Sequence, residues 1–282
     1  MKKLLTAILA AVLCICGSFG LTACTPPTEP VIKGITSATF DESKDQLVVA
    51  TNAAFAPFEY KLGNKFAGID IEIVKGLADS LGKELVILDM KFDGVVQSVG
   101  SGGADLAAAG LTVNPQRAEH VTFSDSYYTA SQYILVPASN TEFDACTTAT
   151  EVEAILNVAG KKLGAQVGTT GYYLAKGDAD WGFDGYTNAE TLAFDNAGLA
   201  VTEMKAGLID YVVVDAAPAE AMVKVIPGIK AIKIALTEEE YAFGIAKDNA
   251  ELLQQVNAYL AQIKQDGTFD AICEKYFTHY GE

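Results

Sequence analysis

Histidine and cysteine are scarce in this chain of 282 residues, and their spacing fits no metal site. His120 and His279 are the only histidines and stand far apart, and no two cysteines form a CxxC motif. Structural and catalytic zinc is held by clustered His and Cys side chains, so a protein metal site is not expected. We expect no cofactor either.

Basic residues are few beside acidic ones. The chain has 20 Lys and Arg against 36 Asp and Glu, which gives a net charge of −16. Lys2 and Lys3 lie in the signal described below, so 18 basic residues face 36 acidic ones afterwards, a net charge of −18. Nucleic acids and anionic lipids are bound by basic patches, and this balance therefore argues against both as partners of the folded part.

The N-terminus has the layout of an export signal. Lys2 and Lys3 precede an apolar run from Leu4 to about Phe19, which is short for a membrane span. The following Leu21-Thr22-Ala23-Cys24 resembles the lipobox of bacterial lipoproteins, in which the cysteine becomes the lipidated first residue. We expect residues 1–23 to be the signal peptide and Cys24 to carry two acyl chains, enough for stable anchoring. The alternative is ordinary signal cleavage.

The segment 24–45 has the composition of a flexible tether. Pro26, Pro27 and Pro30 stand among Thr, Ser and Glu residues, with little apolar periodicity. We expect it to hold the folded part away from the membrane.

Two cysteines remain once Cys14 and Cys16 leave with the signal and Cys24 takes the lipid. Cys146 and Cys273 either form a disulfide, as an exported protein allows, or stay as two buried thiols. The sequence leaves both alternatives open.

Strand-like and helical patterns alternate along the rest of the chain. Residues 46–109 give the order β-α-β-α-β, and a second alternation runs from Gln132 to about Ile234. This alternation predicts an α/β fold with mostly parallel sheets covered by helices. Within the second part, Asn188 is expected to cap a helix that runs to about Asn196.

One pattern occurs twice. Val95–Ala107 and Val201–Val212 each show a helical stretch, a glycine stop, an aspartate and a buried strand. The likeness is too weak for a sequence repeat, but two lobes built on one plan would produce it.

Arg117 is the only arginine, beside nineteen lysines. A lone Arg indicates a task that lysine cannot perform, such as two-point binding of a carboxylate; the alternative is an ordinary surface residue. It lies shortly after the predicted strand 105–109, where ligands of open α/β sheets bind. At the same place Gly110 leaves its backbone open to a ligand, and Thr112 offers a hydroxyl.

A second polar group, Gln166–Gly171, follows a predicted strand and opens a helix. Thr169 and Thr170 lie where exposed helix amides attract anions, although an ordinary capped turn would look the same. Asp215 ends an apolar strand and either caps the next helix or pairs with a cation.

The aromatic residues Phe55, Phe58 and Phe92 stand in loops or at helix starts, and either belong to the core or line a pocket. A clamp for an anion, a lone acid and aromatic walls suit a free α-amino acid. Arg117 and the amides near Thr170 would take its carboxylate, and Asp215, with Gly110 and Thr112, its ammonium.

These residues resemble the polar amino-acid-binding proteins of ABC importers, the bacterial solute-binding protein family 3. The resemblance runs from about Leu47 to Phe277. It rests on ordered motifs: Ala54–Tyr60, Phe66–Glu72, Gly110–Arg117, Phe123–Tyr128, Gly168–Gly171, Val214-Asp215 and Asp266–Asp270.

The resemblance implies a two-lobe, type II periplasmic-binding-protein-like fold. Each lobe is a mostly parallel sheet flanked by helices, and two hinge crossovers lie near Tyr127–Ser131 and Glu240–Phe243. Lobe 1 would comprise 46–127 plus 243–282, and lobe 2 128–242. The family implies an extracytoplasmic monomer that closes on its ligand and is read by a membrane permease.

Asn52 departs from a common pattern, because many relatives carry Asp there, facing the ligand side chain. Asn52 can hydrogen-bond but cannot pair with an ammonium, although Glu59 or another acid could still serve a basic ligand. We therefore favour a polar, uncharged amino acid such as glutamine or cystine.

Two other functions remain open at this stage. The same fold resembles exported cyclohexadienyl or arogenate dehydratases, yet the sequence shows no nucleophile–base pair, so an enzyme is not expected. An amino-acid-sensing binding module is the other alternative.

Overall fold

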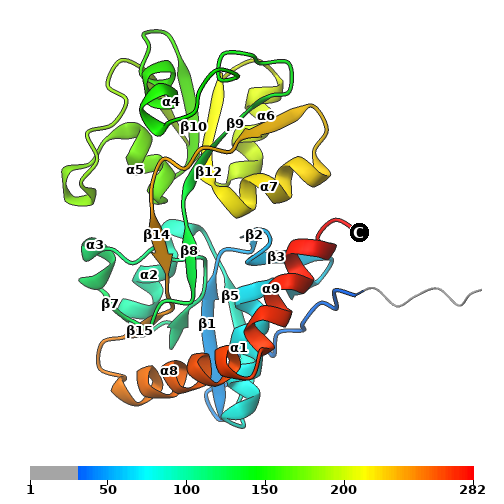
Figure 1. The fold of residues 1–282 in the computed structure, drawn as a ribbon. Helices are drawn as coiled ribbons and strands as arrows, with labels where there is room; N and C mark the ends of the chain where they lie inside the picture. The colour runs from blue at the N-terminus through cyan, green and yellow to red at the C-terminus, as the bar shows by residue number, and fades with distance from the viewer. Residues whose placement is uncertain (1–30) are drawn as a thin grey trace, which may run out of the picture. The chain divides into compact units, whose positions relative to one another are not determined.

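The computed structural model describes residues 31–282, so the predicted signal peptide and Cys24 lie outside the described residues. Two five-stranded sheets, each flanked by helices, form two lobes joined by a pair of crossover strands (Figure 1). The α/β, two-lobe fold predicted from the sequence is therefore confirmed.

Lobe 1 is built on the sheet β5-β1-β6-β15-β7. Only β15 runs antiparallel to its neighbours. A small three-stranded sheet, β2-β3-β4, and five helices complete the lobe. The bounds are β1 Gln46–Thr51, β2 Ala54–Phe55, β3 Glu59–Leu62, β4 Lys65–Ala67, α1 Ile69–Ser80, β5 Glu84–Asp89, α2 Phe92–Gly100, β6 Leu106–Ala107, α3 Pro115–Ala118, β7 Val121–Phe123, β15 Gly244–Ala246, α8 Ala250–Gln265 and α9 Thr268–His279.

Lobe 2 repeats this plan with the sheet β11-β10-β12-β9-β13, in which only β9 is antiparallel to its neighbours. Four α-helices and one short 3-10 helix surround it. The bounds are β9 Gln132–Pro137, α4 Ala149–Leu156, β10 Lys162–Gln166, α5 Thr170–Lys176, η1 Ala179–Trp181, β11 Glu190–Phe194, α6 Ala197–Lys205, β12 Tyr211–Asp215, α7 Ala216–Val225 and β13 Ile229–Ile232.

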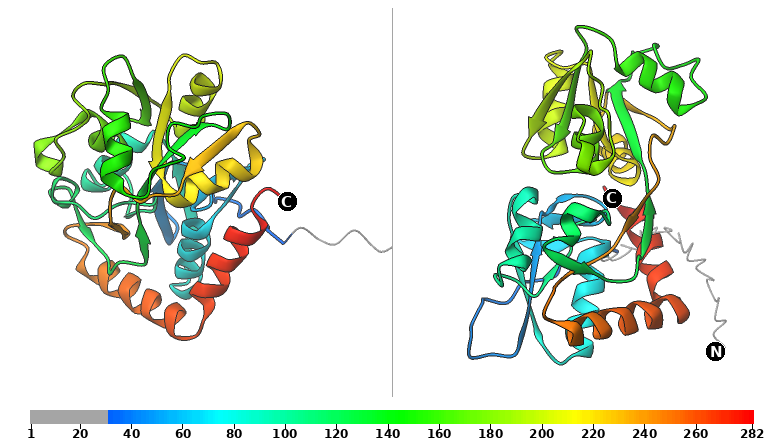
Figure 2. Two further views of the ribbon diagram at one scale, coloured as in Figure 1. Left: turned by 45° about the horizontal axis from the view of Figure 1, so that its top comes forward. Right: turned by 90° about the vertical axis from the view of Figure 1, so that its left-hand side faces the viewer.

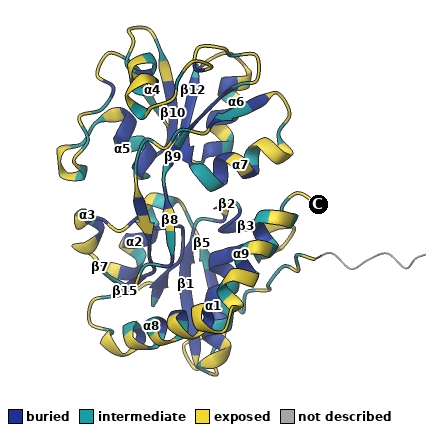
Figure 3. Ribbon diagram, in the orientation of Figure 1, coloured by how far each residue is buried: buried dark blue, intermediate teal, exposed yellow. Residues whose placement is uncertain are grey.

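The central strands are apolar because both of their faces are covered (Figure 3). In β1, Leu47 and Val49 pack with α1, α8 and α9, whereas Val48 and Ala50 pack with α2 on the opposite face. All six residues of β1 are buried, so the strand shows no alternation of polar and apolar side chains.

The chain crosses between the lobes at β8 (Tyr128–Ala130) and β14 (Glu239–Tyr241). The two strands pair antiparallel, with Tyr128 opposite Tyr241, and run side by side (Figure 2). The first crossover lies where the family resemblance places it, and the second overlaps the expected Glu240–Phe243 but begins one residue earlier. We keep 46–127 plus 243–282 and 128–242 as the proposed extents of the lobes.

The doubled sequence pattern corresponds to matching structures. Asp105 precedes β6, and its backbone N–H and carboxylate bond the backbone O and N of Val48, each at 2.8 Å. Asp210 precedes β12 and bonds Lys162 in the same way, at 2.9 and 2.8 Å. Each aspartate thus fixes the start of a central strand against its neighbour.

One predicted helix is wrong. Residues 190–194 form β11, which pairs in parallel with β10, and the helix that follows begins later. Its cap is Asn196 rather than Asn188: the Asn196 Oδ1 accepts from the Leu199 N–H at 2.9 Å. Pairing with β10 outweighs the weak helical spacing of this segment.

Part of the predicted tether is packed against lobe 1. Ile35 bridges Phe66, the Ala38 N–H donates to the Leu85 carbonyl at 2.8 Å, and the Ser37 Oγ accepts from the Ile87 N–H at 2.8 Å. Because β5 is an edge strand, residues 35–38 cover backbone groups that would otherwise be exposed. We propose that a tether ends before Ile35.

Cys146 and Cys273 are free thiols, each partly buried. Cys146 borders the core of lobe 2 and Cys273 that of lobe 1, so the second of the two alternatives holds.

Candidate functional site

A small cavity between the lobes brings together the residues predicted to bind ligand. The space between atoms there is about 260 Å³, part of which is open to solvent. Eight of the nine predicted residues line it, with Gln166 in place of the ninth, Asn52; they are Phe55, Phe92, Gly110, Thr112, Arg117, Thr169, Thr170 and Asp215. The single arginine and the acid at the end of β12, which belong to different lobes, thus face one cavity.

Arg117 lies in α3 and is held by its cap, because the Asn114 Oδ1 accepts from the Arg117 N–H at 2.8 Å. Its guanidinium donates through Nη1 to the Thr112 carbonyl at 2.8 Å and through Nη2 to the Gly168 carbonyl of lobe 2 at 3.1 Å. Burial lowers the pKa of Arg117 to about 10, against the opposing influence of Glu239 and Asp215, so the group stays charged at neutral pH.

Asp215 ends β12 and is buried. It stands at the N-cap position of α7, but its side chain makes no capping hydrogen bond. Instead its Oδ2 accepts from the Tyr241 hydroxyl at 2.5 Å. Burial, followed by the charge of Glu239, raises the pKa of Asp215 to about 7. A cation beside it would stabilise the ionised form.

Three polar side chains form a chain of hydrogen bonds across the cleft. The Thr170 hydroxyl of lobe 2 donates to the Thr112 hydroxyl of lobe 1 at 3.1 Å, which donates to Glu239 Oε2 at 2.7 Å. Glu239 also accepts from Gln132 and Thr237 at 3.0 and 2.6 Å. Thr112 therefore has an acceptor position that a ligand ammonium could share.

Thr169 acts as a helix cap, the structural alternative considered from the sequence. Its hydroxyl accepts from the Tyr172 N–H at 3.3 Å and donates to the Gln166 carbonyl at 2.7 Å. It still lines the cavity, between the strand end and the first turn of α5.

The aromatic residues divide between wall and core. Phe55 and Phe92 line the cavity, whereas Phe58 is fully buried. The Phe55 ring packs on Gly110, whose φ is +53°; a Cβ there would stand 2.9 Å from the ring. Glycine at 110 thus serves both the backbone conformation and the close contact.

Asn52 does not line the cavity, which differs from the sequence prediction. Its Nδ2 donates to the Met90 carbonyl at 2.7 Å, and its Oδ1 accepts from the Gln166 Nε2 at 2.8 Å. Both ends of the amide are occupied, and the second bond joins the two lobes. Gln166 bonds Asn52 and lines the cavity; the sequence placed it at the start of the second polar group but did not predict that it binds ligand.

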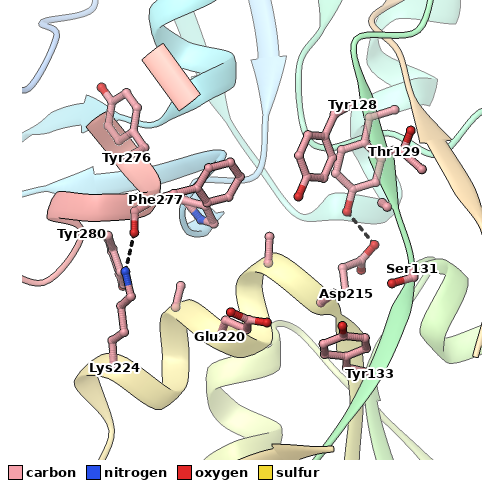
Figure 4. A pocket seen from close by; sticks show the side chains of 16 residues that line it. Tyr128, Thr129, Ser131, Tyr133, Asp215, Glu220, Lys224, Tyr276, Phe277 and Tyr280 are labelled. Carbon is pink, nitrogen blue, oxygen red and sulfur yellow. Dashed lines mark hydrogen bonds between the residues drawn. The ribbon is translucent and has the colours of Figure 1, made fainter. Parts of the chain in front are cut away.

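A larger cavity of about 1040 Å³ lies on the hinge side, between α7 and α9 (Figure 4). Its charged groups already have partners: Glu220 pairs with Lys233 at 3.0 Å, and the Lys224 ammonium donates to the Phe277 carbonyl. Asp215 borders this cavity too, but Arg117 does not. We therefore place the candidate site in the smaller cleft, where both charges of a zwitterion would find a counterpart.

Two further features concern the described part of the chain. Within residues 31–282, no helix combines the length and apolar character needed to cross a membrane. Among the same residues, no three His, Cys, Asp or Glu side chains are placed to hold a metal ion together.

Known proteins share this architecture. The arginine-binding extracellular protein ArtP of Bacillus subtilis is 29% identical over 288 residues, covering 99% of each chain. The structure of AbpA, an amino-acid ABC transporter substrate-binding protein of Streptococcus pneumoniae bound to L-arginine, is 32% identical, with a TM-score of 0.73, and the match covers 85% of this chain and 98% of that one. The structure of an ancestral arginine-binding protein bound to glutamine is 35% identical, with a TM-score of 0.72, and the match covers 83% of this chain and 98% of that one.

The family model of the bacterial extracellular solute-binding proteins, family 3, matches residues 47–279. This chain belongs to that family of amino-acid-binding proteins.

Proposed function

We propose that this protein captures a polar, uncharged amino acid in the interlobe cleft and delivers it to the membrane permease of an ABC importer. The observation that carries the proposal is the meeting of Arg117 and Asp215, one from each lobe, at a single cavity. A ligand bridging them would hold the lobes together, and the closed form is the one that a permease could recognise.

The uncharged side chain is inferred from the end of the cleft near Asn52. Gln166 lines the cavity there with a neutral amide, and Asn52, which accepts a hydrogen bond from Gln166, is neutral too. Two acids beside these residues already have cations. Asp195, whose carbonyl accepts from Gln166 Nε2, pairs with Lys91 at 2.9 Å, and Asp89, which accepts from the Ala53 N–H, pairs with Lys61 at 2.6 Å.

Glu59, the acid left open for a basic ligand, is a poor partner for one. It is fully buried and does not line the cavity. Burial, with the charges of Asp70 and Asp215, raises the pKa of Glu59 well above its usual range, which favours the neutral acid. ArtP is named for arginine and AbpA was solved with L-arginine bound, but an ancestral arginine-binding protein is also described with glutamine bound. Glutamine or cystine remains the ligand that we favour.

A thermal-shift screen of the mature chain tests the ligand. A true ligand at 100 times its Kd adds about 2.7 kcal/mol to the free energy of unfolding. We expect glutamine or cystine to raise the melting temperature more than arginine, histidine or lysine. A larger shift with arginine would refute the uncharged ligand, and no shift with any amino acid would refute amino-acid capture.

We also propose that the protein is held outside the cytoplasmic membrane by a lipid on Cys24. The proposal rests on the lipobox-like motif at residues 21–24. In cell fractionation, the membrane fraction should contain the lipidated mature form of the wild-type chain. The same fraction should contain no lipidated mature form of Cys24→Ala. Membrane association that survives Cys24→Ala unchanged would overturn the anchor.

A further inference from the structure

The only tryptophan of the chain lies against the only arginine. The ring centroid of Trp181, in η1 of lobe 2, lies 4.9 Å from the guanidinium carbon of Arg117 in lobe 1. The Phe92 ring of lobe 1 lies 5.3 Å from the same carbon. Trp181 does not line the ligand cavity, so its contact is with the clamp rather than with the space that a ligand would fill.

Gln116, the neighbour of Arg117, fixes the same contact through hydrogen bonds to lobe 2. Its Oε1 accepts from the indole N–H of Trp181, and its Nε2 donates to Asp180 Oδ2 at 3.2 Å. Both bonds run between α3 and η1, and hence between the lobes.

The loop that carries Trp181 is itself well ordered by local bonds. The Asp178 side chain caps η1, accepting from the N–H groups of Asp180 and Trp181 at 3.0 and 3.3 Å, and Asp178 bridges Phe183. Within lobe 2, the Tyr173 ring stacks on the indole, with the ring centroids 4.6 Å apart and an angle of 23° between the ring planes. The indole is thus supported from its own lobe and faces a cation of the other.

We infer that Gln116, Asp180 and Trp181 form a latch, which closes over Arg117 when the lobes meet, holds its guanidinium in place and slows release of the ligand. This inference rests on the proposed function. All latch contacts cross the lobe boundary, so opening must break them before a ligand can leave. Entry occurs while the lobes are apart, when the contacts are absent. The latch therefore acts on the dissociation rate and hardly on the association rate.

The test measures both rate constants for the amino acid identified in the screen, by rapid mixing and by chase of radiolabelled ligand. A partly desolvated cation–π contact with its hydrogen bonds corresponds to a change of about 3- to 30-fold, so Trp181→Ala should raise the dissociation rate by that factor. Trp181→Phe keeps a ring over Arg117 and should recover part of the loss. Gln116→Ala should raise the rate less than Trp181→Ala.

The matched control is Lys91→Ala, which removes a different contact between the lobes, the exposed pair with Asp195. Exposed ion pairs contribute little, and the dissociation rate should change by less than about twofold. A Trp181→Ala rate equal to that of Lys91→Ala would overturn the latch while leaving the proposed function intact. The latch would also be overturned if Trp181→Ala lowered the association rate by as large a factor as it raised the dissociation rate, because that would indicate general damage to the fold.

Indole fluorescence gives a second readout. In wild type, ligand should protect Trp181 from acrylamide quenching, and Gln116→Ala should weaken that protection. If wild type binds no amino acid, the proposed function fails. If the ligand protects Trp181 from quenching equally in wild type and in Gln116→Ala, the latch is refuted while the proposed function stands.

Discussion

Replacing Arg117 is the most direct perturbation of the candidate site. The guanidinium is buried, with 7% of the residue exposed, and two of its N–H groups donate to the carbonyls of Thr112 and Gly168. The proposed ligand carboxylate would take two charge-assisted bonds, each contributing about 1.5–3 kcal/mol. Arg117→Ala should therefore weaken binding by about 3–6 kcal/mol, or roughly 10²- to 10⁴-fold in Kd.

Arg117→Lys tests whether a positive charge alone is enough, or whether the planar guanidinium is needed. Lysine keeps the positive charge but cannot present two parallel donors or lie flat against the rings of Phe92 and Trp181. We expect an intermediate loss, about 10- to 100-fold in Kd. Lys44→Ala, at an exposed pair with Glu84, is the control and should leave Kd unchanged.

Isothermal titration calorimetry with the ligand from the screen provides the Kd values. Circular dichroism and a melting curve of each ligand-free variant check that it is folded. If folded Arg117→Ala binds within about threefold of wild type, the guanidinium does not hold the carboxylate, and the clamp assigned here is wrong.

Three further outcomes follow from the structure. Burial raises the pKa values of Asp70 and Asp215 to about 7, so the folded form holds their protons more tightly than the unfolded form. The free energy of unfolding should therefore fall as pH rises from about 4 to 7, by up to about 1.4 kcal/mol per pH unit for each group. In urea unfolding at about pH 5 and pH 8, Asp215→Asn should reduce this difference in the ligand-free protein, and an unchanged difference would contradict the shift. Gly110→Ala should cost about 1–3 kcal/mol of unfolding free energy, because alanine is strained at a φ of +53° and meets the Phe55 ring; a fully stable variant would show that the loop yields. Prephenate and arogenate should not be turned over, and measurable dehydration would revive the enzyme alternative.

Most of the site could be predicted because its residues stand at the ends of strands. Gly110, Thr112 and Asp215 follow apolar runs, and the fold brings the carboxyl ends of those strands to one cleft. The rarity of arginine pointed to Arg117 in the same way. Tryptophan is equally rare, and the same reasoning would have pointed to Trp181.

What could not be predicted depends on contacts between distant segments. Asn52 turns away from the cavity because its amide bonds Met90 and Gln166, and neither partner is visible in a local pattern. Residues 35–38 look like a linker in sequence, since backbone bonds to an edge strand need no apolar periodicity. The strand β11 was mistaken for a helix because five residues offer too little periodicity to decide.

The pairing of β8 with β14 restricts how the lobes can move. Two separate linkers would let the lobes slide and twist independently, but the antiparallel pairing of Tyr128–Ala130 with Glu239–Tyr241 makes the linkers a single ribbon. Two paired strands bend together far more easily than one strand slides along the other, because sliding would break the hydrogen bonds between them. Opening and closing should therefore follow one rotation, which returns Arg117 and Asp215 to the same separation in every cycle.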